Sequence, residues 1–121
     1  DANLNVIHEL RQKTGLTIGY SDHTEGSKAL CYAVAMGAEI LEFHFTDTRE
    51  GKQFRDHKVS LTVDEVKQLI AEIELIRTYQ GEYNKQPTAI ELANKHEISF
   101  RRAVYPSRDI AVGELLTSNN L

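Results

Sequence analysis

The sequence predicts an α/β fold in which helices alternate with parallel strands. Apolar residues recur at helical spacing over residues 4–14, 27–37 and 62–79, and two shorter runs, 16–21 and 39–45, alternate between apolar and polar residues as strands do. The connections between these segments are short. The resulting order, helix–strand–helix–strand–helix, is typical of parallel βα units.

The first two helices and the strands that follow them are marked by glycines. The helix over residues 4–14 is followed by Gly15, a natural C-cap residue, and then by the strand over residues 16–21. The helix over residues 27–37 is rich in Ala and Leu, which predicts burial, and its last residue is also a glycine. The strand over residues 39–45 comes next.

The third helix has a defined start. A polar loop over residues 46–60 leads to Thr62-Val-Asp-Glu65, the pattern of a capping box, and the helix runs to about Tyr79 before Gly81 closes it. Its predicted apolar face consists of Val66, Leu69, Ile70, Ile73, Leu75 and Ile76. Two parallel strands and three helices do not make a complete fold, because a parallel sheet needs more strands and has both of its faces covered. We therefore expect further strands on the N-terminal side.

The composition changes after the third helix. Residues 82–97 are polar, with a short helical stretch near 89–93, and we interpret them as a linker between domains. Residues 98–105 predict a strand, followed by a turn at 106–109. The remaining residues, to 121, have the pattern of a small β-module at its beginning.

Composition excludes several classes of protein. The 121 residues are 40% hydrophobic and 26% charged, with a net charge of −4 when His is neutral, and the basic residues are scattered, which argues against nucleic-acid binding. No apolar run approaches the roughly 20 residues of a membrane span, and the first residues have neither the basic n-region nor the apolar h-region typical of a signal peptide. The single cysteine, Cys31, excludes an internal disulfide and favours a reduced, cytoplasmic compartment; we expect it to be a helix packing residue.

Two histidines occupy matching positions at the ends of the two predicted strands. His23 and His44 lie 21 residues apart, which is one βα unit, so neighbouring parallel strands would place them side by side. By parity, one face of each strand carries Thr17, Gly19, Ser21 and His23 or Ile40, Glu42 and His44. In a barrel this face lines the interior, and it becomes polar toward the carboxyl ends, where βα-barrel active sites lie. Neutral imidazoles suit Mn, Fe, Ni or Zn better than Mg.

Other polar residues leave alternatives open. The carboxylates of Asp22, Glu42 and Asp56 could be metal ligands, could orient the imidazoles or could contact a polyol. His57 could contact substrate or only solvent. Lys28 could contact a phosphate, but we expect it to be a solvated lysine at the start of a helix. We do not expect a role in the site for the other two histidines: His8 is expected to be a solvated residue of the first helix, and His96 lies in the predicted linker.

Three strings together resemble the sialic acid synthase family. They are Gly19-Tyr-Ser-Asp-His-Thr24, Ala38-Glu-Ile-Leu-Glu-Phe-His-Phe-Thr46 and Asp56-His-Lys-Val-Ser-Leu61, and the tail from Arg108 to Leu121 is similar to the start of that family's antifreeze-like (SAF) domain. The resemblance implies the last two βα units of a (β/α)₈ TIM barrel over residues 1–81, a linker over 82–97 and the start of an SAF domain over 98–121.

The resemblance also implies an activity and a set of roles. Members of this family condense phosphoenolpyruvate with an N-acylated aminohexose such as N-acetylmannosamine, releasing phosphate. By this resemblance His23 and His44 bind a divalent metal, typically Mn²⁺, Ser21 and Asp56 contact the substrates, and Glu42 is a site-facing acid of open role. The parent enzyme is expected to be a cytoplasmic, domain-swapped homodimer, and residues 1–121 alone are expected to be inactive.

Two other interpretations of the sequence remain open at this point. The same two histidines could serve another metal-dependent barrel enzyme, such as a sugar isomerase or aldolase. Alternatively, the chain could be a non-catalytic α/β interaction module in which His23 and His44 are only structural.

Overall fold

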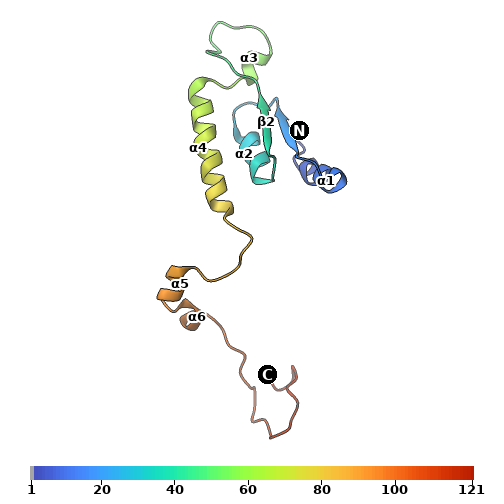
Figure 1. Cartoon of the computed structure of the whole chain (residues 1–121), viewed down its shortest axis with the longest axis vertical. Helices are drawn as coiled ribbons and strands as arrows, with labels where there is room; N and C mark the ends of the chain where they lie inside the picture. Colours follow the sequence, from blue (N-terminus) through green and yellow to red (C-terminus); the bar gives the residue numbers. More distant parts are fainter. Residues whose placement is uncertain (1) are drawn as a thin grey trace. The chain divides into compact units, whose positions relative to one another are not determined.

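The chain forms two compact units, Asp1–Glu82 and Tyr83–Leu121, each described by itself. The structure is a computed structural model that describes residues 2–121. The elements of the first unit are α1 (Asn5–Thr14), β1 (Gly19–Asp22), α2 (Lys28–Ala35), β2 (Ile40–Phe43), α3 (Asp56–Val59) and α4 (Val63–Gln80) (Figure 1). The predicted alternation of helices and strands is confirmed, with α3 as an addition inside the predicted polar loop.

The two strands form a parallel sheet in the register that the βα spacing requires. Gly19 pairs with Ile40 and Ser21 with Glu42 across the sheet. A Cβ added to Gly19 would lie 3.2 Å from both the Cβ and the carbonyl oxygen of Ile40, so the strands approach closely here because one of the two residues has no side chain.

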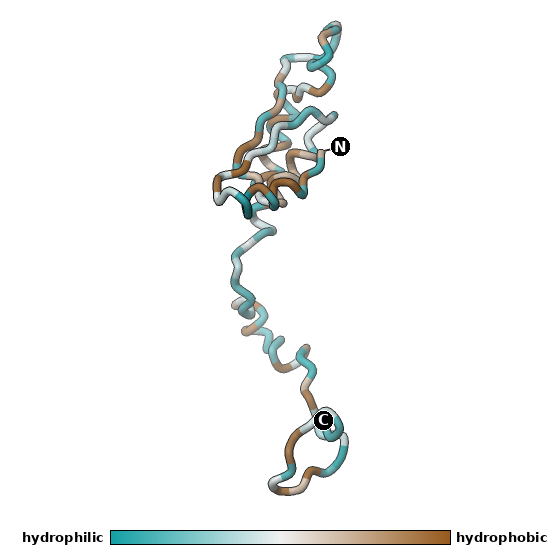
Figure 2. Tube along the Cα trace, turned by 90° about the vertical axis from the view of Figure 1, so that its right-hand side faces the viewer, coloured by the Kyte–Doolittle hydropathy of each residue, from teal (hydrophilic) through white to brown (hydrophobic). Residues whose placement is uncertain are grey.

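The helices pack against one face of this sheet. Ile7 of α1, together with Ile18, Ala33 and Ala38, forms one buried cluster, against which Tyr20 of β1 packs. A second buried cluster of Leu30, Leu61 and Leu69 joins α2 to α4 and takes Tyr20, Leu41 and Phe43 from the strands. Hydrophobic residues gather in these strands and helices in Figure 2. The parity prediction is confirmed, because Tyr20, Leu41 and Phe43 face the helices while Ser21 and Glu42 are exposed on the other face.

Helix α4 begins and ends as predicted but turns a narrower face inward. The capping box of Thr62 and Glu65 is present, and Gly81 follows the last turn. Leu69 is buried, whereas the side chains of Ile70 and Leu75 are 53% and 42% exposed, so the prediction that these two belong to the packed face is wrong. Both lie off the stripe that a straight helix of 3.6 residues per turn presents to one neighbour.

The loop between β2 and α4 is closed at its base by backbone hydrogen bonds. The Leu61 amide donates to the His44 carbonyl oxygen at 2.8 Å, and the Thr46 amide donates to the Leu61 carbonyl oxygen at 3.0 Å. Phe45 and Leu61 therefore form a parallel bridge that extends the direction of β2. This closure fixes the backbone of His44 just beyond the strand.

The second unit contains α5 (Ala89–Ala93) and α6 (His96–Ser99). Helix α5 coincides with the predicted helical stretch and opens with a capping box of Thr88 and Glu91. The predicted strand over residues 98–105 is wrong: its first two residues belong to α6, and no strand is assigned between residues 100 and 121. A strand needs a partner to satisfy its amides and carbonyls, and the described part of this unit offers none.

The end of the second unit is organised by side-chain hydrogen bonds instead. The Asn120 side chain, in a residue that is 2% exposed, accepts from the Thr117 amide and donates to Glu114 and to the Leu115 carbonyl oxygen. The Ser107 amide donates to the Asn120 carbonyl oxygen at 3.1 Å. Among residues 2–121, no helix combines the length and apolar character that crossing a bilayer requires.

Candidate metal centre

Four of the five predicted site residues lie on the exposed face of the sheet or just beyond it. Ser21 and Glu42 are register partners on β1 and β2, and the Ser21 hydroxyl donates to the Glu42 carboxylate. His23 and His44 follow each strand by one residue and share the parity of this pair. The parallel arrangement brings both imidazoles to the carboxyl edge of the sheet.

The two imidazoles face each other through the same ring atom. The Nε2 atoms of His23 and His44 are 3.1 Å apart, and the ring centroids are 4.8 Å apart with the planes at 72°. Two nitrogen ligands about 2.1 Å from one tetrahedral or octahedral metal ion lie about 3.0–3.4 Å from each other. In the structure the two nitrogens share a hydrogen bond, and their separation also lies within the range of two adjacent ligands of a divalent transition metal.

The histidines do not form a complete ligand set within the described chain. No group of three or more His, Cys, Asp or Glu side chains able to hold a metal occurs among residues 2–121. His23 and His44 can thus supply two ligands, and water, substrate or other residues must supply the others.

The carboxylates that flank the histidines are engaged elsewhere. Asp22 is 4% exposed, and its carboxylate accepts hydrogen bonds from Tyr20 and Thr24. Glu42 accepts from Ser21. No hydrogen bond found in residues 2–121 joins Asp22 or Glu42 to an imidazole, so neither carboxylate orients a ring by direct contact.

Asp56 reaches the vicinity of His23 from a different element. It is the first residue of α3, and a pocket of about 350 Å³ is lined by His23, Arg55, Asp56 and Val59. The Arg55 Nε lies 3.3 Å from the Asp56 carboxylate. Arg55 was not among the predicted site residues, because a single arginine in a polar loop carries no signal that distinguishes it from a solvated residue.

An ion pair connects the loop that carries His23 to α3. The Lys58 Nζ lies 2.6 Å from the Glu25 carboxylate. Their hydrogen bond and mutual attraction hold the pKa of Glu25 below its usual value and raise the pKa of Lys58. The two side chains are 76% and 66% exposed, so water screens the pair and it contributes little to the position of α3.

His57 also belongs to α3, beside Asp56. Its Nδ1 is buried without a hydrogen-bond partner in the described residues, and its ring meets Phe54 edge-on at a centroid distance of 6.3 Å. The contact with Phe54 gives the ring a packing role.

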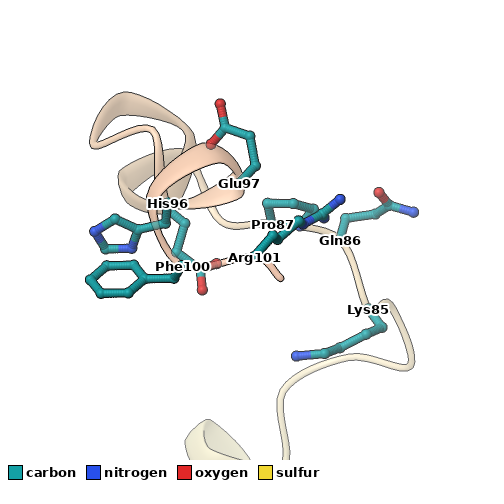
Figure 3. A pocket seen from close by; sticks show the side chains of 8 residues that line it. Lys85, Gln86, Pro87, His96, Glu97, Phe100 and Arg101 are labelled. Carbon is teal, nitrogen blue, oxygen red and sulfur yellow. The ribbon is translucent and has the colours of Figure 1, made fainter. Parts of the chain in front are cut away.

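A separate pocket of about 350 Å³ lies within the second unit (Figure 3). Its wall includes the ring of His96, which packs edge-on against Phe100 at 4.9 Å, and two basic residues, Lys85 and Arg101. The carboxylate of Glu91, also in the wall, is held by Thr88. None of the predicted site residues lines this pocket.

The sequence is similar to a family of known synthases. The profile of the NeuB family matches residues 1–85. The chain is 34% identical over 121 residues to an N,N′-diacetyllegionaminic acid synthase of Campylobacter jejuni. This alignment covers 100% of the chain and 35% of the relative. It is 32% identical over 121 residues to a pseudaminic acid synthase of the same species, covering 100% of the chain and 34% of the relative.

A solved structure supports the same grouping. The crystal structure of an N-acetylneuraminic acid (sialic acid) synthetase from Leptospira borgpetersenii, in complex with citrate, superposes with a TM-score of 0.72 at 37% identity. The match covers 82% of this chain and 34% of that one, so the α/β fold described above is similar to part of that enzyme. The chain spans about a third of the length of the curated relatives it matches.

Proposed function

The chain belongs to the NeuB family, the sialic acid synthases, and from this premise we propose that residues 1–121 are part of a nonulosonic acid synthase. The parent enzyme would condense phosphoenolpyruvate with an N-acylated aminohexose such as N-acetylmannosamine and release phosphate. Its relatives include legionaminic, pseudaminic and sialic acid synthases, so the product belongs to this class of nine-carbon acids.

One observation carries the proposal at the level of chemistry. The Nε2 atoms of His23 and His44 converge to 3.1 Å at the carboxyl edge of two adjacent parallel strands. We assign these two nitrogens as ligands of a divalent metal, Mn²⁺ by family resemblance. When bound, such an ion supplies Lewis-acid polarisation of the carbonyl oxygen of the open-chain sugar.

The remaining site residues would bind and orient the substrates. Asp56 lines the same pocket as His23, and its carboxylate can accept hydrogen bonds from sugar hydroxyls. Ser21 is held by Glu42, which leaves lone pairs of the Ser21 hydroxyl oxygen for a substrate donor. Glu42 would thereby fix the direction of the Ser21 hydroxyl on the site-facing side of the sheet.

The architecture proposed for the parent rests on the family resemblance, together with the chain's coverage of about a third of its relatives. Residues 1–81 would be the last two βα units of a (β/α)₈ TIM barrel, residues 82–97 a linker, and residues 98–121 the start of an SAF domain. The parent would be a cytoplasmic, domain-swapped homodimer, and residues 1–121 alone would be inactive because the strands that bind phosphoenolpyruvate belong to the rest of the barrel.

Calorimetric titration of the full-length protein with Mn²⁺ tests the metal assignment. His23→Ala and His44→Ala should each weaken binding at least about 10-fold, since even the loss of residues around the ligands costs 10–100-fold. His8→Ala is the matched control, because His8 is exposed on α1. If both variants bind Mn²⁺ as the wild type does, the histidines are structural and the proposal fails.

Phosphate release separates the synthase from a metal-dependent isomerase or aldolase. The full-length protein, given phosphoenolpyruvate and each of a panel of N-acylated aminohexoses, should release inorganic phosphate with at least one of them. No release with any aminohexose, from a protein that binds Mn²⁺ through His23 and His44, would favour the isomerase or aldolase instead.

A further inference from the structure

Asp22 is a buried carboxylate beside the proposed metal site that the proposed function does not use. It is the last residue of β1, it is 4% exposed, and it lies on the helix-covered face of the sheet with Tyr20. A buried charge is costly unless several hydrogen bonds compensate for it. The presence of such a group in an otherwise apolar layer calls for a specific role.

The hydrogen bonds of Asp22 enclose His23. The Asp22 Oδ1 accepts from the Thr24 amide at 3.0 Å, and the Oδ2 accepts from the Thr24 hydroxyl at 3.2 Å. A side chain that bonds the amide two residues further on forms an Asx turn, and the residue in the middle of that turn is His23. The backbone that directs the imidazole is therefore fixed from both sides.

Tyr20 anchors this turn to the core. Its hydroxyl donates to the Asp22 Oδ1 at 2.8 Å, and its ring packs against both buried clusters of the first unit. Burial, together with the hydrogen bond to Asp22 and the negative charge there, raises the pKa of Tyr20 to about 12. The hydroxyl thus stays a donor throughout the neutral range.

The geometry excludes Asp22 from a direct place beside the imidazoles. Both of its oxygens are occupied by Tyr20 and Thr24, and strand parity puts its side chain on the opposite face from Ser21 and Glu42. Its effect on the site must pass through the backbone of the turn.

We infer that Tyr20, Asp22 and Thr24 are positioning residues that hold the His23 imidazole at ligand distance from His44. The inference rests on the proposed function, since it assumes that this pair binds Mn²⁺. We call these three residues, Tyr20, Asp22 and Thr24, the clamp. It is needed on the β1 side because His23 is an exposed residue in a turn, whereas the His44 carbonyl oxygen accepts a hydrogen bond from the Leu61 amide.

The test uses the full-length protein and substitutions that remove one hydrogen bond each. Tyr20→Phe removes the hydroxyl and keeps the ring in the core, and Thr24→Val removes the hydroxyl of a partly exposed residue without touching the core. Thr24→Ser keeps that hydroxyl. Tyr79→Phe is the matched control, because Tyr79 is 78% exposed on α4.

Three readouts separate positioning from a general loss of stability. Mn²⁺ affinity is measured by calorimetry, the melting temperature is measured without metal, and histidine Cε1–Hε1 NMR signals report the His23 ring in the metal-free protein. Tyr20→Phe and Thr24→Val should weaken Mn²⁺ binding by about 10-fold. Both should also shift or broaden the His23 signal, while Thr24→Ser and Tyr79→Phe behave as the wild type does.

The possible failures are distinguishable. If Tyr20→Phe and Thr24→Val lower only the melting temperature and keep wild-type Mn²⁺ affinity while His23→Ala loses the metal, the clamp is merely structural and the inference is overturned, although the proposed metal site stands. If His23→Ala itself binds Mn²⁺ normally, the proposed site and the inference fall together.

Discussion

A bidentate ion pair between the loop after β2 and α4 should make the stability of the protein depend on pH. The Arg49 guanidinium donates to the two carboxylate oxygens of Glu65 at 2.7 and 2.6 Å, and also to the Ser60 carbonyl oxygen at 2.7 Å. The Thr62 amide donates to the same carboxylate at 2.8 Å. The Arg49 hydrogen bond, followed by that of the Thr62 amide, lowers the pKa of Glu65 from 4.5 to about 2.

The size of the effect follows from this shift. Because one pKa unit corresponds to about 1.4 kcal/mol, the full shift would contribute about 3 kcal/mol to the free energy of unfolding at neutral pH. The side chains of Arg49 and Glu65 are 40% and 31% exposed, so water screens the pair, and we expect about 1 kcal/mol.

The direction of the pH dependence is fixed by the lowered pKa. Between about pH 4.5 and pH 2 the unfolded chain binds a proton at Glu65 that the folded protein does not. The contribution is therefore complete above about pH 5 and is lost as the pH falls toward 2. Lower pH should loosen the loop that carries Asp56 before it affects the strands.

Urea unfolding of the full-length protein at pH 6 and pH 2 measures this contribution. Glu65→Gln keeps an oxygen that can accept from the Thr62 amide and removes the charge, so it should be about 1 kcal/mol less stable at pH 6 and should differ little from the wild type at about pH 2. Glu74→Gln on the exposed side of α4 is the control. An equal loss for Glu65→Gln at both pH values would show that the ion pair contributes nothing and refute the reasoning.

Two further substitutions test the packing of each unit. Leu30→Ala should lower the free energy of unfolding by about 2–5 kcal/mol, because Leu30 is fully buried against α4. Tyr32→Ala is the control on the same helix and should cost far less, because Tyr32 is 61% exposed. Equal losses for the two variants would contradict the described core. Asn120→Ala should speed hydrogen exchange of the Thr117 amide by about 5-fold or more, since that amide loses its acceptor. Asn119→Ala is the control. Unchanged exchange in Asn120→Ala would contradict the hydrogen bond from the Thr117 amide to the Asn120 side chain.

Local patterns were sufficient for the elements that local interactions stabilise. The capping box at Thr62 and the helix over residues 89–93 were both predicted, because the residues that define them lie within one turn of each other. The strand predicted over residues 98–105 was wrong for the opposite reason: strand pairing depends on a neighbour that the pattern itself does not contain. Helix α3 was missed because it has only four residues, three of them polar, and so carries no helical periodicity.

The same distinction applies to the site. Strand parity and the spacing of one βα unit predicted that His23 and His44 would lie side by side. The role of Asp22 was left open, and the structure buries its side chain on the opposite face. The family resemblance placed Asp56 at the site, but the proximity of Arg55 to His23 could not be predicted, since it depends on how a 15-residue loop closes. Whether the residues bind metal and substrates stays a prediction.

A gradient along the exposed face of the sheet agrees with the proposed barrel. Along β2 this face carries Ile40, Glu42 and then His44, and along β1 it carries Gly19, Ser21 and then His23.

Ile40 is 58% exposed in the described chain, which is unfavourable for an isolated sheet but suits a position in the packed interior of a barrel, toward its amino-terminal end. Because parallel strands align their carboxyl ends, both strands change from small or apolar residues to hydrogen-bonding residues and then to imidazoles in the same direction. A non-catalytic module would gain nothing from this shared order, whereas an enzyme that binds its metal at the carboxyl face of a barrel requires it.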